Sequence, residues 1–343
     1  ILMYKRGSYN EPELTGPVNL CLPDGKLNPA AVGWSRRPLH NCNLNGAFLR
    51  KKRWNYWCIT TEKCLFSATL SNTDYLGLAF VYFLDFETNY FHELTVARPF
   101  GRGCVLGSRV EDEINFIDKQ LEMSFLKRDS YTFIKLKCPD FGGQTLNADL
   151  TVKMLPDHET LNVVIPWSPR RFQFTSKQNT LPVEGIIALG EKKYDSVGGY
   201  ACLDFGRGIW PYSSFWNWAS ASGKGDDRLI GLNFGAGWTD GTGMNENGIC
   251  IDGVLTKISE DLIFEYNPAA LMNPWHFRTA VTDRVDVTMV PFYERVAKTD
   301  IVLLKSEVHQ MIGRFSGTVT DSSGVVHNFT DIIGWAEEHH AKW

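Results

Sequence analysis

Short runs in which apolar and polar residues alternate recur along the chain, and they predict β-strands. ADLTVKM at 148–154 and RVDVTMV at 284–290 have the two-residue period of a half-buried strand, whereas long stretches with a helical period are rare. Further runs rich in β-branched and aromatic residues lie at 54–60, 64–70, 121–126, 131–136, 229–234 and 313–320. The chain is therefore predicted to be all-β.

Turn sequences between these runs indicate antiparallel pairing. The loops TDSSG at 320–324 and IDGV at 251–254 contain the Asp and Gly residues that tight hairpin turns need. A sheet of many strands must also protect its edges, and closure into a barrel does so while leaving a lumen for a ligand. We therefore expect antiparallel β-barrels.

An internal similarity suggests two barrels. RWNYWCIT at 53–60 resembles FWNWASAS at 215–222, and the first tryptophans of the two segments, Trp54 and Trp216, are 162 residues apart. That spacing fits one ligand-binding barrel. The polar, glycine-rich segment EKKYDSVGG at 191–199 would join them, so we predict an N-terminal barrel over 1–195 and a C-terminal barrel over 196–343.

Composition is that of an ordinary globular protein, with 43% hydrophobic and 22% charged residues. The net charge of -4 argues against a nucleic-acid partner. The longest uncharged apolar run, at 75–84, has ten residues, against the roughly 20 that span a bilayer, so no transmembrane segment is expected. Eight cysteines at irregular spacings, without CxxC or zinc patterns, indicate a reducing, cytoplasmic location.

The segment 200–223, YACLDFGRGIWPYSSFWNWASASG, concentrates the candidate chemistry. Asp204 and Arg207 are predicted catalytic residues, because ionisable groups embedded in aromatic surface are desolvated and their pKa values move toward useful ones. A carboxylic acid could protonate a carbon–carbon double bond, and indole faces could stabilise the resulting cation. The opposing interpretation is an ion pair between the two residues at a barrel seam. The aromatic candidates for substrate binding here are Trp210, Tyr212, Trp216 and Trp218.

Two further places offer candidate binding residues. Trp238 and Asp240 lie in the glycine-rich segment GWTDGTGMNENG at 237–248, which has no calcium-loop spacing and is interpreted as a loop at a barrel mouth. His309 lies in a predicted strand and could face a pocket or be a core histidine. No P-loop, GxGxxG, GxSxG or zinc spacing is present, so neither a cofactor nor a metal is expected.

Long tryptophan-rich motifs carry a resemblance over nearly the whole chain. WSRRPLHNCNLNG and RKKRWNYWCIT in the first half, with GIWPYSSFWNWASASG, GWTDGTGMNENGICIDGVLTKI and the closing IIGWAEEHHAKW in the second, resemble the domain-of-unknown-function family 2804. That resemblance implies no activity.

A more distant resemblance implies a fold and a site. GYACLDFGRG followed by WNW is similar to a signature of the tandem lipocalin-like superfamily, which includes carotenoid 1,2-hydratase, AttH-type proteins and lipocalin-like Diels–Alderases. In those families the acid is followed by His and then TrpGly, whereas Asp204 here is followed by Phe205, Gly206 and Arg207. The terminal GWAEEH resembles the superfamily's last glutamate-bearing strand. It implies a pocket position for Glu337 or catalytic Glu338, of which only one can face a pocket because neighbours on a strand point to opposite faces.

Three functions remain open at this point. The first is a cofactor-independent hydratase, isomerase or cyclase that acts on a mainly apolar, terpenoid or polyketide-like small molecule in a barrel near the seam. The second is a non-catalytic carrier or sensor of a hydrophobic ligand, and the third is a carbohydrate-binding or carbohydrate-cleaving protein. A cavity with an inward carboxyl favours the first, a cavity without ionisable groups the second, and an open cleft with two carboxylates the third.

Overall fold

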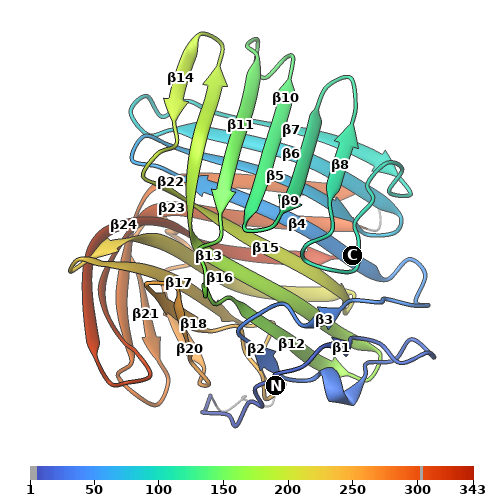
Figure 1. Ribbon diagram of the computed structural model, residues 1–343, viewed down its shortest axis with the longest axis vertical. Coiled ribbons are helices and arrows are strands. Elements are labelled where there is room, and N and C mark those ends of the chain that lie inside the picture. The colour runs from blue at the N-terminus through green and yellow to red at the C-terminus, as the bar shows by residue number, and fades with distance from the viewer. Residues whose placement is uncertain (1–5, 302–303) are drawn as a thin grey trace.

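The computed structural model describes residues 6–301 and 304–343 and consists of two large antiparallel sheets. They lie one above the other in Figure 1, and each is strongly curled. A small parallel pair, β1 (Val18–Asn19) and β3 (His40–Asn41), and a short 3-10 helix, η1 (Pro29–Ala31), lie near the N-terminus. No helix in the described part of the chain has the length and hydrophobicity to cross a membrane.

The first sheet has 13 strands, and its main path runs β7-β6-β5-β4-β15-β13-β11-β10-β9-β8. Its remaining strands attach beside this path, because β12 and β14 pair with β13, and β2 pairs with β12. The strands are β2 (Trp34–Ser35), β4 (Lys51–Thr60), β5 (Cys64–Asn72), β6 (Leu76–Asp85), β7 (Phe91–Pro99), β8 (Ile114–Ile117), β9 (Glu122–Arg128), β10 (Tyr131–Cys138), β11 (Leu146–Lys153), β12 (Leu161–Ser168), β13 (Arg171–Leu189), β14 (Lys192–Asp195) and β15 (Gly199–Ile209).

The second sheet has nine strands in the order β19-β18-β17-β16-β24-β23-β22-β21-β20. They are β16 (Ser213–Gly225), β17 (Arg228–Ala236), β18 (Gly248–Ile251), β19 (Val254–Lys257), β20 (Leu262–Glu265), β21 (Trp275–Thr279), β22 (Val285–Ile301), β23 (Leu304–Thr320) and β24 (Val326–Lys342).

The main paths of the two sheets repeat one topology. In each sheet a four-stranded meander, β4 to β7 or β16 to β19, pairs through its first strand with a long strand, β15 or β24, that leads to the rest of the sheet. The similar segments seen in the sequence are therefore equivalent, because 53–60 lies in β4 and 215–222 lies in β16. This is the architecture of two tandem lipocalin-like units, and it confirms the predicted fold class.

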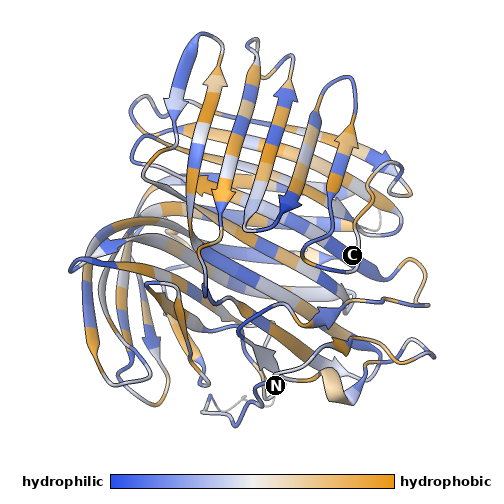
Figure 2. Cartoon of the chain, viewed as in Figure 1, coloured by the Kyte–Doolittle hydropathy of each residue, from blue (hydrophilic) through white to orange (hydrophobic). Residues whose placement is uncertain are grey.

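The two faces of each sheet pack against different parts of the molecule. Successive residues of a strand point to opposite faces, and the alternating colours along the strands show this in Figure 2. On one face of the first sheet, Trp57, Phe66 and Phe174 belong to a large hydrophobic core, and the second sheet builds its own core around Phe234 and Phe277. The opposite faces of the two sheets meet in a third cluster at the seam. Each curled sheet therefore packs a hydrophobic core against one of its faces, and the cluster between the two sheets forms a separate layer.

Glycines bend the long strands where their backbones approach a neighbour. Gly185 in β13 has φ +123°, and a Cβ there would lie 2.1 Å from the carbonyl oxygen of Asp149. Gly317 in β23 has a comparable position, 2.2 Å from the carbonyl oxygen of Asp286. Only glycine fits such close contacts, so these residues allow the sheets to curl.

All eight runs predicted from the sequence coincide with strands, three of them with one residue beyond the strand end, and both predicted hairpin loops connect neighbouring strands, β18 to β19 and β23 to β24. All eight cysteines are free and buried. Strand β15 lies in the first sheet, between β4 and β13, so the chain passes from one sheet to the other at residues 210–212. A domain boundary near residue 195 stays a prediction.

Candidate functional site

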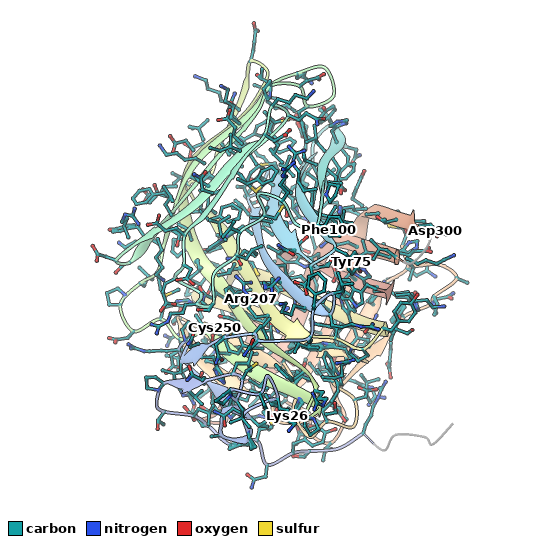
Figure 3. The ribbon with its side chains drawn as sticks, turned by 90° about the vertical axis from the view of Figure 1, so that its right-hand side faces the viewer. Lys26, Tyr75, Phe100, Arg207, Cys250 and Asp300 are labelled. Carbon is teal, nitrogen blue, oxygen red and sulfur yellow. The ribbon has the colours of Figure 1, made fainter. Side chains whose placement is uncertain are left out.

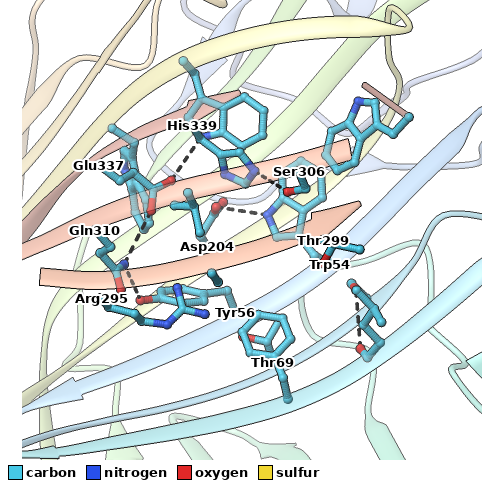
Figure 4. A pocket seen from close by; sticks show the side chains of 18 of the residues that line it. Trp54, Tyr56, Thr69, Asp204, Arg295, Thr299, Ser306, Gln310, Glu337 and His339 are labelled. Atoms are coloured by element: carbon cyan, nitrogen blue, oxygen red, sulfur yellow. Dashed lines mark hydrogen bonds between the residues drawn. The ribbon is translucent and has the colours of Figure 1, made fainter. Parts of the chain in front are cut away.

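A cavity of about 290 Å³ lies at the seam, between the faces of the two sheets that point away from their own cores. Its walls come from β4 to β7, β13 and β15 of the first sheet and from β16 and β22 to β24 of the second. Figure 4 shows carboxyl, amide and imidazole groups converging on it. The expected binding place inside a barrel is therefore replaced by a space between two sheets, because apolar side chains fill both cores.

Six tryptophans form much of the wall. The ring centroids of Trp210 and Trp238 are 5.4 Å apart and nearly parallel, and Trp216 lies 5.5 Å from Trp210. The wall is completed by Trp54, Trp218 and Trp343. Such a surface suits an apolar ligand, and indole faces also attract positive charge.

Asp204, on β15, lies in the cavity wall, where three side chains contact its carboxyl group. Its Oδ2 accepts a hydrogen bond from Trp54 Nε1 at 3.0 Å and forms an ion pair with Lys177 Nζ at 3.0 Å. Its Oδ1 accepts a hydrogen bond from Thr175 Oγ1 at 3.0 Å. Arg207, its expected ion partner, is replaced in that role by Lys177.

Lys177, on β13, bridges two carboxylates. Its Nζ lies 3.2 Å from Glu246 Oε2 and 4.0 Å from the centroid of the Trp218 ring. Burial opposes the charged amine, but Asp204 and Glu246 outweigh it and raise the pKa of Lys177. Burial raises the pKa of Glu246, which also accepts a hydrogen bond from Trp238 Nε1 at 2.8 Å.

Glu337, on β24, lies in the same wall, but its neighbours are neutral hydrogen-bond donors and not a lysine. Its side chain accepts hydrogen bonds from Trp216 Nε1 at 3.0 Å and from Gln310 Nε2 at 3.5 Å. Within residues 6–301 and 304–343, no lysine, arginine or histidine forms an ion pair with it. Burial raises the pKa of Glu337 to about 7, so the neutral acid is well populated at physiological pH.

Gln310 connects Glu337 to two buried phenols. Its Oε1 accepts a hydrogen bond from Tyr82 at 2.8 Å, its Nε2 donates to the Tyr56 hydroxyl at 3.4 Å, and the two hydroxyls are 2.8 Å apart. The amide is therefore oriented with Nε2 toward the carboxyl group. Burial raises the pKa of both tyrosines, which keeps them neutral.

The cavity wall also contains an ion pair that connects the two sheets. Arg295 on β22 makes two hydrogen bonds of 2.9 Å to Glu93 on β7 and lies 4.2 Å from the Tyr82 ring centroid. His339 contacts Ser306 Oγ at 2.8 Å, and burial together with Arg295 lowers the pKa of this imidazole. Thr299 and Ser306, which are paired near the joint end of β22 and β23, also line the cavity, and that end projects from the body at Asp300 in Figure 3.

The two sheets supply equivalent tryptophan–carboxyl pairs. In the first sheet Trp54 donates its indole N–H to Asp204, whose cross-strand partner on β4 is Tyr56, two residues after that tryptophan. In the second, Trp216 donates to Glu337, and the cross-strand partner of Glu337 on β16 is residue 218, again two residues after the tryptophan. The repeated topology thus brings both pairs to one cavity.

The surroundings of the two pairs differ in several side chains, including Tyr56 in place of Trp218 and the Thr175 hydrogen bond to Asp204, and one of the differences changes the local charge. The cross-strand partner of Asp204 on β13 is Lys177, and that of Glu337 on β23 is Gln310. A cation therefore lies beside one carboxyl group and a neutral amide beside the other.

Of the residues that the sequence singles out, the structure places Asp204, Trp210, Trp216, Trp218, Trp238 and Glu337 in the cavity wall. Their roles in catalysis and binding stay predictions. Arg207, three residues from Asp204 on the same strand, points to the opposite face and is buried there. Its guanidinium donates to the carbonyl oxygens of Gly107, Trp54 and Gly206 and to Asn55 Oδ1.

Other predicted residues lie outside the wall. Glu338 faces the core of the second sheet, where it accepts a hydrogen bond from Tyr266. His309 pairs with Glu294 and Glu307 at 2.7 and 2.9 Å. Asp240 accepts from the backbone of Gly237 in a turn, and Tyr212 is 49% exposed in the connection between the sheets.

Sequence reasoning missed Lys177, Gln310 and Arg295 as members of the site. Trp54 was visible through the internal similarity but was not assigned to a pocket, and Glu246 was interpreted as a loop residue. Gln310 follows His309 in the chain and therefore points to the opposite face of β23. The strand register, which pairs Gln310 with Glu337, would have identified it as the residue that faces the cavity. For Lys177, the polar residues at 173, 175 and 177 on one face of a strand are the available signal.

The fold and the cavity define a protein of two tandem lipocalin-like sheets with a ligand-sized space between them. Similar solved structures include CghA with Sch210972, at 11% identity over 86% of this chain and 89% of that chain, with a TM-score of 0.54. A putative AttH from Nitrosomonas europaea has 13% identity over 94% of this chain and 99% of that chain, with a TM-score of 0.53. At such identities these structures share the fold.

The chain belongs to the family described as domain of unknown function DUF2804, whose profile matches residues 11–343. The comparison with curated proteins finds no match. The sequence resemblance to this family is confirmed.

Proposed function

We propose that the protein is an enzyme of the hydratase, isomerase or cyclase type that acts on a mainly apolar small molecule in the cavity between the sheets. The observation that carries the proposal is the carboxyl group of Glu337, which lies in an indole-lined cavity without an ion-pair partner among the described residues. A neutral carboxylic acid in such a place can donate a proton, as general acids do.

Glu337 takes the acid role that the sequence suggested for Asp204. In the proposed reaction its O–H bond breaks, and a carbon of a substrate double bond uses its π electrons to bind the proton. The resulting cation accepts water, loses another proton or is attacked by a second double bond, which gives a hydratase, an isomerase or a cyclase respectively. The Glu337 carboxylate regains a proton from the product-forming step.

The remaining wall would stabilise positive charge on the substrate. The indole faces of Trp210, Trp216 and Trp54 lie around the cavity, and a desolvated cation–π contact contributes about 2 kcal/mol. Asp204 lies in the same wall, where Lys177 and the Trp54 N–H fix the position of its carboxyl group beside the substrate. No cofactor is required for these steps.

The direct test is turnover in D2O. Native mass spectrometry of the freshly purified protein would first identify any co-purified molecule, and a set of terpenoid and polyene alkenes would complement it. We expect the wild type to incorporate deuterium into the product at carbon, and Glu337→Gln to reduce that rate at least 100-fold with the fold and ligand affinity kept.

Glu338→Gln is the matched comparison, because it changes the neighbouring residue on the opposite face of β24. It should keep turnover near the wild-type rate. Equal turnover in wild type and Glu337→Gln would reject the acid role, and a bound ligand that is never converted would identify a carrier.

A further inference from the structure

We propose that the residue at the equivalent positions 177 and 310 decides which of the two repeated carboxyl groups keeps its proton. Lys177 would hold Asp204 as a fixed anion, and Gln310 would leave Glu337 as the proton donor. The inference extends the proposed function and rests on it, because it names Gln310 as a positioning residue for the acid.

The argument starts from geometry that is shared by the two sheets. Each carboxyl group accepts an indole N–H at 3.0 Å, from Trp54 or Trp216, and each lies in the wall of the same cavity. Their strands have the same neighbours in the same register. The difference in charge comes from the third strand, which supplies a lysine to Asp204 and a glutamine to Glu337, while the other differences nearby, such as Thr175 beside Asp204, are between neutral side chains.

Electrostatics gives that difference a clear sign. A cation within about 4–6 Å lowers the pKa of a carboxyl group by about one to three units, whereas burial without a cation raises it. Lys177 Nζ is 3.0 Å from Asp204 Oδ2, and burial raises the pKa of Glu337 to about 7. Gln310 supplies an N–H that positions the carboxyl group without adding charge.

The other charged groups around Glu337 are already engaged. Arg295 on β22 is paired with Glu93 on β7, and Lys177 on β13 is shared by Asp204 and Glu246. His339, on the same strand as Glu337, is neutral because burial and Arg295 lower its pKa. Arg295 and Lys177 act on Glu337 from a distance and lower its pKa, but burial outweighs them.

The decisive variant is Gln310→Lys, which gives the second sheet the residue of the first. Infrared difference spectra report the C=O stretch of a protonated carboxyl group, and Glu337→Gln assigns the band because it removes it. In Gln310→Lys the pKa read from this band should fall by about one to three units, so the protonated fraction at pH 7 should drop from about half to about a tenth or less.

Gln310→Met is the matched control, because it removes the amide and adds no charge. Its Glu337 band should persist at pH 7. A folded Gln310→Lys protein with an unchanged Glu337 titration would overturn the inference, as would an equal fall in Gln310→Met.

The reverse change covers the case in which lysine at 310 prevents folding. Lys177→Met combined with Glu246→Gln removes the cation and the second carboxylate, and a new protonated-carboxyl band should appear near neutral pH. That band should be absent when Asp204→Asn is added; no new band would contradict the inference. These spectra need no substrate, so failed turnover of the proposed reaction would leave them interpretable.

Discussion

The Glu337 carboxyl group should make stability depend on pH. Its pKa is about 7 in the folded protein, against an ordinary value of 4.5, so the fold prefers the protonated form. The stabilisation is complete below pH 4.5 and is lost as the pH rises toward 7.

We therefore predict that the free energy of unfolding of the wild type, relative to Glu337→Gln, falls by about 3 kcal/mol between pH 4.5 and pH 7. Urea denaturation at a series of pH values measures this difference. A difference that is constant with pH would show that the side chain titrates normally.

Residues of the site could be predicted from the sequence where they are close along the chain or stand in a recognised motif. Asp204 and the tryptophans up to Trp218 lie within 14 positions of one another, and Glu337 was selected through the resemblance of the terminal segment. Lys177 and Gln310 reach the cavity through cross-strand pairing, which local patterns do not contain. The choice between Glu337 and Glu338 likewise required knowledge of which face of β24 points to the cavity. The alternation of apolar and polar residues in the sequence does not decide this.

Strand positions, in contrast, followed from short-range patterns. The two-residue period of 148–154 and 284–290 arises because one face of β11 and β22 is buried, and this is a local property. The place of the cavity could not be derived in this way. The position of the cavity depends on which faces the two sheets turn toward each other. Side-chain contacts between the sheets, such as the hydrogen bond from Arg295 on β22 to Glu93 on β7, contribute to that arrangement.

At the scale of one strand, the bend of β13 depends on Gly185. Gly185→Ala should destabilise the protein by about 3 kcal/mol or more, because the added Cβ meets the Asp149 carbonyl oxygen and the backbone has positive φ. Gly198→Ala is the control, since Gly198 has φ +84° and open space around a Cβ, so only about 1 kcal/mol is expected. Thermal denaturation of both variants measures the difference. Equal losses would mean that the close contact at Gly185 relaxes freely.

At the scale of the whole molecule, the Arg295–Glu93 pair fastens one sheet to the other. Glu93→Gln leaves a buried guanidinium without its carboxylate, and removal of one partner of a buried pair costs about 3–5 kcal/mol. We expect Glu93→Gln to unfold in a single transition at a lower denaturant concentration than the wild type. Circular dichroism measures this transition.

Asp300→Asn is the comparison, because the Lys305–Asp300 pair is exposed and such pairs contribute less than about 1 kcal/mol. If both variants unfolded at the same denaturant concentration, the pair would not hold the sheets together.

The tryptophan wall has a practical consequence. Six of the 11 tryptophans border the cavity, so more than half of the protein's indole fluorophores lie in the wall that a bound molecule would face. A compound that enters should quench or shift this intrinsic fluorescence without any label. Chemical libraries can therefore be screened against the unmodified protein before its natural substrate is known, with the indoles themselves as the detector.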